Sequence, residues 1–174
     1  MTRIIALIMA VLLGMSGCGY HLRGSTPGVW NLGRLYVQNA TPLGNEVQRL
    51  LSLSGVAFAD SAARADAILS FGREAQERRV LSVDPDTGKV REYELVIDAL
   101  IRVTRPDGTV ILEDEPVTLQ RDYTFDETAA LGKFEEEGAL YNELRKDMAG
   151  VIVRRLQALS AHTSAAAAKS TGAQ

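Results

Sequence analysis

Cys18 is the only cysteine of this sequence, and its thiol is the most chemically distinctive side chain in it. A thiol can act as a nucleophile, bind a metal, form a disulfide or accept an acyl chain, and the first three uses need a partner residue. The only histidines are His21, close to the cysteine, and His162, near the C-terminus. Neither position suits a thiol–imidazole pair or a metal site, and no second cysteine is available for a disulfide.

The residues before Cys18 have the layout of a signal peptide. Thr2-Arg3 supplies a positive n-region, and Ile4 to Leu13 is an aliphatic stretch of about ten residues, whereas a bilayer-spanning helix needs about 20. Met15-Ser16-Gly17-Cys18 then resembles a lipobox, with Met15 in the place of the usual leucine. We predict a lipoprotein signal peptide over residues 1–17 and acylation of Cys18. The alternative is an ordinary signal peptide followed by an incidental cysteine.

An acylated Cys18 would anchor the chain to a membrane. Two or three acyl chains, at ~0.8 kcal/mol per buried methylene, hold a protein there effectively permanently. Gly19, rather than an aspartate, follows the cysteine. By resemblance to bacterial lipoproteins, this favours the periplasmic side of the outer membrane. We expect residues 18–33 to form the lipid anchor and a spacer.

Composition narrows the function classes. The formal net charge is −3, and removal of residues 1–17 takes away Arg3 and no acid, which makes the mature chain one unit more negative. A mildly acidic chain argues against general nucleic-acid binding, which usually shows as a basic domain. The remaining length of about 157 residues suits a single domain with its own core.

No other set of residues predicts catalysis. The sequence has no Gly-rich phosphate loop and no Gly-x-Ser-x-Gly motif. Asp84 and Asp86 flank a turn proline, and Glu135-Glu136-Glu137 starts a predicted helix, so both acidic groups are interpreted as structural. We therefore predict no enzymatic activity, no cofactor and no metal.

The first half of the domain predicts two strands and a helix. Residues 34–39 form a short strand, and residues 44–54 have the apolar spacing of an amphipathic helix that Gly55 ends. Residues 67–83 form a long strand that is apolar at both ends. Its polar run, residues 73–79, is expected to lie over an edge of the sheet or to project from it.

The clearest strand pattern covers residues 90–104. From Tyr93 onward, one face is apolar at every position: Tyr93, Leu95, Ile97, Ala99, Ile101 and Val103. Val96 and Leu100 are the apolar exceptions on the polar face. They either mark a partner contact or are scattered exposed apolar residues, which are common.

The second half predicts a returning strand and the longest helix. A turn at residues 105–108 leads into a strand over 109–123, with a bulge expected near Pro116. Residues 134–160 form an amphipathic helix. Residues 161–174 lack periodicity and are expected to be disordered, so the predicted domain covers residues 34–160.

Three motifs together resemble the LptE family, the lipoproteins of the outer-membrane lipopolysaccharide translocon. Cys18 to Gly24 resembles the family's start, and Gly88 to Leu95 is similar to its hairpin crossing. Residues 130–133, with the helix that ends in residues 152–156, are similar to its C-terminal segment. Residues 56–80 carry no motif that aligns.

The resemblance implies an α+β fold, a two-layer sandwich of two helices on a mainly antiparallel or mixed four-stranded sheet. It also implies that the domain plugs the large β-barrel LptD, supports its assembly and binds lipopolysaccharide. Tyr20, His21 and Leu22 become candidates for a partner contact near the membrane, together with Val96 and Leu100.

The lipopolysaccharide site that the resemblance implies consists of basic residues at a strand turn and at a strand-to-helix loop. Lys133 occupies the family's loop lysine. Asp86 stands where a basic turn residue is expected, and Lys89 and Arg91 are nearby substitutes. Lysine and arginine suit the phosphates of lipid A. The alternative for Lys133 is a solvated loop residue.

Two other functions remain open from the residues alone. A lipid-anchored α+β domain of this size can bind peptidoglycan or serve an ABC transporter as a periplasmic adaptor, and it can also be purely structural. A peptidoglycan binder needs a pocket of convergent polar residues, which the sequence does not indicate.

Overall fold

The computed structural model describes residues 30–38, 41–125 and 130–171, and the side chains of residues 130–134 and 164–171 are not described. The sheet contains β1 (Leu35–Gln38), β2 (Ala67–Val83), β3 (Val90–Thr104) and β4 (Val110–Thr124), in that spatial order. β1 is parallel to β2, and the other neighbours are antiparallel.

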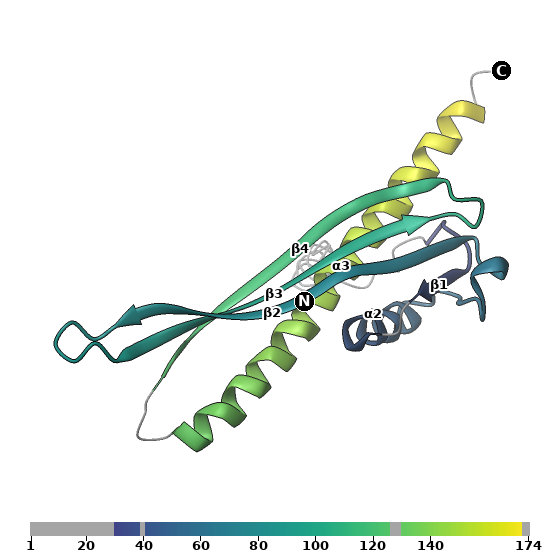
Figure 1. The fold of residues 1–174 in the computed structure, drawn as a ribbon. Coiled ribbons are helices and arrows are strands. Elements are labelled where there is room, and N and C mark those ends of the chain that lie inside the picture. Colours follow the sequence, from purple (N-terminus) through teal and green to yellow (C-terminus); the bar gives the residue numbers. More distant parts are fainter. Residues whose placement is uncertain (1–29, 39–40, 126–129, 172–174) are drawn as a thin grey trace, which may run out of the picture.

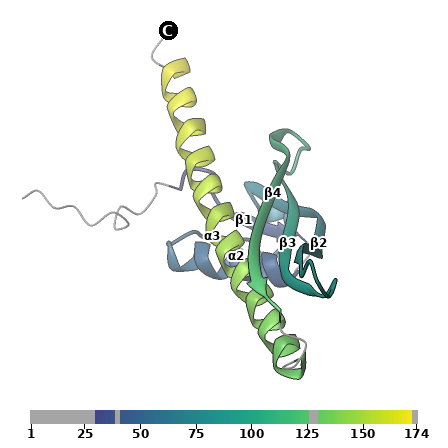
Figure 2. The same ribbon diagram turned by 90° about the vertical axis from the view of Figure 1, so that its left-hand side faces the viewer.

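Two α-helices, α2 (Pro42–Leu53) and α3 (Ala130–Thr171), lie on one side of the sheet, as Figures 1 and 2 show together. A short 3-10 helix, η2 (Ala62–Arg64), precedes β2. The predicted two-layer α+β sandwich with a mixed four-stranded sheet is therefore confirmed.

The core lies between the inner face of the sheet and the two helices. From Leu95 to Val103 the predicted apolar face of β3 is at most 2% exposed, because α2 and α3 cover it. The helices contribute buried residues at helical spacing: Leu43, Val47 and Leu51 from α2, and Leu144, Met148, Ile152 and Leu156 from α3. Burial of each such side chain contributes about 1.5–3 kcal/mol.

The start of α2 differs from the prediction by two residues. Thr41 is the N-cap, and its hydroxyl oxygen accepts a hydrogen bond from the Gly44 N–H at 3.0 Å. Pro42 takes the first helical position, which has no N–H to satisfy. Thr41-Pro42 thus begins the helix, and Gly55, with φ at 81°, follows its end as predicted.

The polar run of β2 is paired with β3 along its length. β1 pairs only with residues 67–70, so beyond Ser70 β2 has β3 alone as a neighbour among the residues that the structure describes. A bulge between Phe71 and Glu74 reverses the alternation, so the polar residues that follow it change faces. This reversal explains why the sequence shows no continuous apolar face here.

The bulge predicted near Pro116 is confirmed and lies just before it, at Glu113 and Asp114. Pro116 pairs in register with Leu100, and the extra residue lies between Leu112 and Glu115. Proline is tolerated in β4 because β4 is an edge strand. Arg102 holds the bulge, since its guanidinium donates to both carboxylate oxygens of Asp114 at 2.7 and 2.8 Å.

α3 is longer than predicted at both ends. It begins at Ala130 rather than Phe134 and continues to Thr171 rather than Ser160. The prediction of disorder is therefore wrong for residues 161–171, which are helical. The limits of the domain stay a prediction. Alanine has the highest helix propensity, and the C-terminal part of α3 projects past the strands, where no core exists to impose an apolar stripe (Figure 1).

Two glycine-to-alanine substitutions should change stability in opposite directions. Gly33 has φ at 70°, and a Cβ there would lie 2.6 Å from the Asp66 side chain. We expect Gly33→Ala to lower the free energy of unfolding by more than about 1 kcal/mol. Gly150 is inside α3, where a Cβ would meet only Arg154 at 3.5 Å. Gly150→Ala should raise that free energy by about 0.5–1 kcal/mol. Urea unfolding measures both, and equal signs would contradict the described backbone.

Candidate functional site

Residues 80–92, called the hairpin end below, extend past the start of α3 at one end of the molecule (Figure 1). The Asp84 carboxylate organises the turn by accepting hydrogen bonds from the Asp86 N–H at 3.0 Å and the Thr87 N–H at 2.8 Å. Gly88 has φ at 69°, a conformation that other residues rarely adopt. The turn expected at the proline between Asp84 and Asp86 is thus confirmed as a structured loop.

Arg91 is held by this turn. Its guanidinium donates two hydrogen bonds to one Asp84 carboxylate oxygen, the Nε bond at 2.9 Å. The Thr87 N–H, and after it the Arg91 guanidinium, hold the pKa of Asp84 well below its usual value. The Arg91 side chain is still 64% exposed, so an anionic ligand can reach it, but only in competition with Asp84.

The chain segment that leads into α3 meets the hairpin end directly. The Phe125 N–H donates to the Arg91 carbonyl oxygen at 2.8 Å. A hollow of about 610 Å³ lies beside this contact, lined by Ser82, Val83, Arg91, Glu92, Thr124 and Phe125. Lys89 is exposed on the turn, and Lys133 lies in the first turn of α3, where its side chain is not described. The strand turn and the start of α3 therefore belong to the same end of the molecule.

An aromatic cluster joins the hairpin end to α3. The Tyr93 ring stacks on Tyr123 at 5.8 Å between centroids and meets Phe125 edge-on at 5.3 Å. The Arg78 guanidinium lies 4.6 Å from the centre of the Tyr93 ring. The Glu137 carboxylate accepts from both Arg78, at 2.9 Å, and the Tyr123 hydroxyl, at 2.8 Å. Glu137 thus connects α3 to two strands.

Exposed apolar residues accompany the charges at the hairpin end. Val80, Leu81 and Val83 are 56%, 48% and 52% exposed, which is unusual for three large apolar side chains so close together. The sequence marks this end of β2 as apolar, but it does not show that the segment extends beyond the helices. The hairpin end therefore presents both apolar and basic groups to an incoming ligand.

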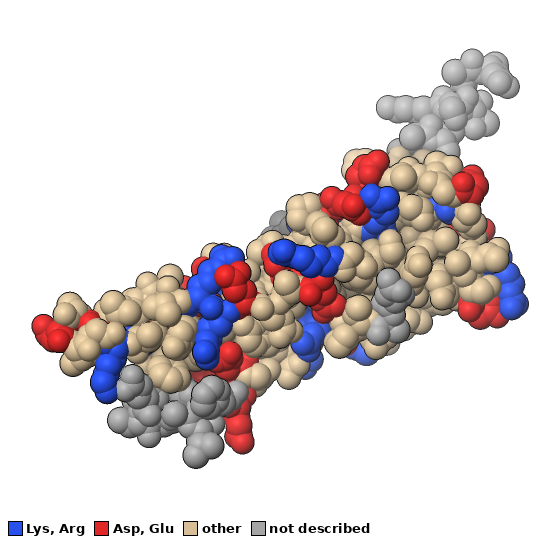
Figure 3. Space-filling view, in the orientation of Figure 1, with Lys and Arg blue, Asp and Glu red and all other residues tan. Residues whose placement is uncertain are grey.

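Among the described elements, no helix lies over the outer face of the sheet, and this face carries paired charges. Figure 3 shows acidic and basic side chains interspersed along the molecule. Val96, one of the two predicted partner contacts on this face, is only 2% exposed in the free chain. Leu100 is half-buried beside Pro116 in a hollow of about 260 Å³. It leaves little room for a side chain at position 72, because a Cβ added to Gly72 would lie 3.1 Å from the Leu100 Cβ. Only Leu100 of the pair is accessible.

Several predicted site residues lie outside the described residues. They are Cys18 and the candidate contacts Tyr20, His21 and Leu22, together with the signal peptide. In the part of the chain that the structure describes, no group of three or more histidine, cysteine or acidic residues is placed to hold a metal ion. None of the described helices is both long enough and apolar enough to cross a membrane.

The chain matches a known family over most of its length. The model of the family described as LptE, lipopolysaccharide-assembly, matches residues 32–156. The LPS-assembly lipoprotein LptE of Pectobacterium atrosepticum is 32% identical over 152 residues, which cover 85% of this chain and 80% of that protein. The LptE of Photorhabdus laumondii is 29% identical over 159 residues, covering 86% and 85% of the two chains.

Solved structures show the same fold. The solution structure of an uncharacterized lipoprotein B from Nitrosomonas europaea is 28% identical, with a TM-score of 0.68, and the match covers 84% of this chain and 94% of that one. The crystal structure of the rare lipoprotein B from Shewanella oneidensis is 27% identical, with a TM-score of 0.64, covering 75% and 97%.

The hydrogen bond between Tyr123 and Glu137 should make the stability of the fold depend on pH in alkaline solution. Burial, and after it the hydrogen bond to Glu137, raises the pKa of Tyr123 to about 12. The stability that the neutral phenol contributes is present below the unfolded tyrosine pKa of about 10 and is lost as the pH rises toward about 12. We expect Tyr123→Phe to remove this alkaline loss of stability, measured by urea unfolding at several pH values. If the stability of the variant fell with alkaline pH as much as that of the wild type, the role of the Tyr123–Glu137 hydrogen bond would be contradicted.

Proposed function

The chain belongs to the LptE family of lipopolysaccharide-assembly lipoproteins, and on that premise we propose that it binds lipopolysaccharide at the hairpin end and plugs the β-barrel LptD. In this role it supports the assembly of the barrel and the delivery of lipopolysaccharide to the cell surface. The chain is held on the periplasmic side of the outer membrane by acylated Cys18. The role is one of binding and needs no enzymatic activity.

The observation that carries the proposal is the meeting of two basic segments that are distant in the sequence. Lys89 and Arg91 are on the hairpin end, and Lys133 is in the first turn of α3. The Phe125–Arg91 backbone hydrogen bond and the Glu137 contacts hold the two segments at one end of the molecule. A ligand with two phosphates can thus meet cations from both segments.

The chemistry of the hairpin end suits an amphiphile. Charge-assisted hydrogen bonds from arginine and lysine bind phosphate groups strongly. The exposed Val80, Leu81 and Val83 offer contact area to acyl chains next to these cations. Because Asp84 already occupies the Arg91 guanidinium, binding of a phosphate exchanges one anionic partner for another. Asp84 therefore lowers the affinity for the ligand while it keeps the turn ordered.

The outer face of the sheet supports the plug. The lumen of a transmembrane β-barrel is polar, and the described outer face carries ion pairs such as Arg73–Asp98 at 3.2 Å and Arg79–Glu94 at 3.6 Å. A face of this kind can sit against a wet wall without a large apolar interface. Leu100 supplies an accessible apolar contact on it, and Tyr20, His21 and Leu22 supply contacts near the membrane. Val96, which is almost fully buried, supports this face by packing beneath its neighbours.

Reversal of the three basic residues tests the ligand site. We expect the combined Lys89→Glu, Arg91→Glu and Lys133→Glu variant to bind purified lipopolysaccharide at least about tenfold more weakly, because three attractive contacts become repulsive. The measurement is a binding titration of the purified chain. Arg49→Glu, Arg64→Glu and Arg105→Glu make a matched control with the same charge change away from the hairpin end. Equal loss in both variants, or no loss in the first, would contradict the site.

Asp84→Asn is expected to change the same titration in the opposite direction. The amide keeps an oxygen for the Thr87 N–H but removes the charge that competes for Arg91. We therefore expect tighter binding of lipopolysaccharide, and weaker binding would show that the Asp84–Arg91 pair is needed intact.

Purification from the membrane tests the plug. The full chain, solubilised from outer membranes in mild detergent, should co-purify with a large β-barrel protein at a constant ratio. Leu100→Glu should reduce this recovery, since it places a charge in the apolar hollow of the outer face. Recovery of the wild-type chain as a free monomer would contradict the proposal that it plugs a β-barrel. Retention on purified peptidoglycan, or with an ABC transporter, would favour the adaptor function instead.

A further inference from the structure

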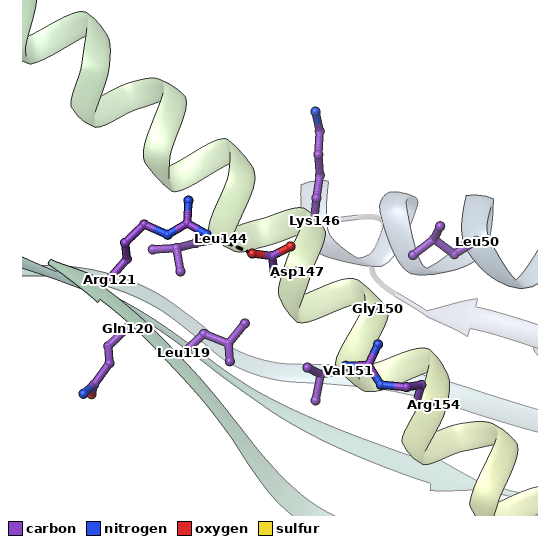
Figure 4. A pocket seen from close by; sticks show the side chains of 10 residues that line it. All are labelled: Leu50, Leu119, Gln120, Arg121, Leu144, Lys146, Asp147, Gly150, Val151 and Arg154. Atoms are coloured by element: carbon purple, nitrogen blue, oxygen red, sulfur yellow. Dashed lines mark hydrogen bonds and ion pairs between the residues drawn. The ribbon is translucent and has the colours of Figure 1, made fainter. Parts of the chain in front are cut away.

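A second hollow lies far from the hairpin end, between α2, α3 and β4 (Figure 4). Its volume is about 460 Å³, within the range of small-molecule sites. Gly150, at its centre, is about 20 Å along α3 from Glu137. We call it the Gly150 hollow. Its walls carry four apolar side chains, Leu50, Leu119, Leu144 and Val151, and the remaining lining residues are Gln120, Arg121, Lys146, Asp147 and Arg154.

The charges of the Gly150 hollow are unbalanced. It holds three cations and one acid, although the whole chain is acidic. Arg121 is neutralised, because it pairs with Glu143 at 2.5 Å and with Asp147 at 3.1 Å. Among the described residues, Arg154 has neither a hydrogen bond nor an ion pair, whereas Lys146 lies close enough to the Glu46 carboxylate to add to the lowering of its pKa by Arg49. Most described arginines form ion pairs, so an arginine without one at the rim of this hollow is a specific feature.

Gly150 gives the hollow its depth. Glycine inside a helix costs about 0.5–1 kcal/mol relative to alanine. The backbone of Gly150 does not require glycine, and a Cβ there would touch only the Arg154 guanidinium, at 3.5 Å. Lys146, Gly150 and Arg154 form one row at i, i+4 and i+8 along α3, so Gly150 is a gap between two cations. Figure 4 shows the Arg154 side chain turned back along the helix toward this gap.

We propose that the Gly150 hollow binds the phosphate headgroup of an anionic membrane phospholipid. Arg154 is placed to receive the phosphate, with Lys146 at the opposite rim. The apolar walls suit the first carbons of the acyl chains, which a free phosphate lacks. Family membership places the chain in the envelope, where such lipids are abundant. This site is separate from the hairpin end and does not depend on the function proposed there.

The test is a titration of the full acylated chain in nonionic detergent, with bound lipid counted by native mass spectrometry. Phosphatidylglycerol should bind at least about tenfold more tightly than phosphatidylcholine, and inorganic phosphate should not compete at the same concentration. Arg154→Glu should weaken phosphatidylglycerol binding about tenfold. Gly150→Leu should do so without a change of charge, because its side chain fills the hollow. Lys146→Glu should have a smaller effect.

The controls keep the proposal falsifiable. Arg64→Glu is the matched charge reversal, at an exposed residue of η2 outside the hollow, and should bind phosphatidylglycerol like the wild type. Thermal unfolding should show that each variant folds. Wild-type binding by both Arg154→Glu and Gly150→Leu would overturn the proposal, as would equal competition by inorganic phosphate. Loss of barrel recovery in Arg154→Glu, with phospholipid binding unchanged, would assign the hollow to an acidic segment of a protein partner.

Discussion

The contact between the inner face of β3 and the two helices is the interaction on which the rest of the structure depends. Leu95, Ile97 and Ile101 are fully buried there, and α3 places Met148 and Ile152 in the same core. Because the described helices cover only one face of the sheet, the other face must be stable in contact with water or with a polar partner. The two-layer arrangement thus determines which surface is left for recognition.

The length of the strands relative to the helices creates the hairpin end. β2 and β3 continue past the region that the helices cover, and this segment is held by other contacts: the Tyr93–Tyr123–Phe125 cluster and the Glu137 carboxylate. These contacts fix the base of the hairpin and leave Val80, Leu81 and Val83 exposed. The segment proposed to bind the ligand is therefore carried on a rigid support, which would lower the entropy lost on binding.

Charge pairing explains how an arginine-rich surface can belong to an acidic chain. Arginines on the outer face, at the hairpin end and along α3 pair with nearby carboxylates, and exposed pairs of this kind contribute little to stability. Their effect is instead on recognition, because a paired guanidinium binds an anion only by exchange. Arg154, at the Gly150 hollow, has no such partner among the described residues. The two anion sites proposed for this domain therefore differ in whether a carboxylate competes with the ligand for the arginine.

Local patterns in the sequence determined much of this protein. The alternation of β3 identified its buried face, the spacing of α2 and of the central part of α3 identified two amphipathic helices, and the motifs indicated the family. These features depend on residues that are close together in the chain. The signals at the ends of elements were weaker: Thr41-Pro42 begins a helix, and the alanine-rich end of α3 is helical because propensity, not periodicity, decides it there.

Only the tertiary structure decided the features that depend on distant residues. The bulge after Phe71 reverses the faces of β2, the bulge of β4 lies at Glu113 and Asp114, and Val96 is buried although it lies on the polar face. Arg91 was predicted as a ligand residue, but its Asp84 partner and its contact with Phe125 came from the fold. Whether a cation is available to a ligand depends on which carboxylates the fold brings within reach of it. Distances between residues that are far apart in the chain cannot be predicted from a local sequence pattern.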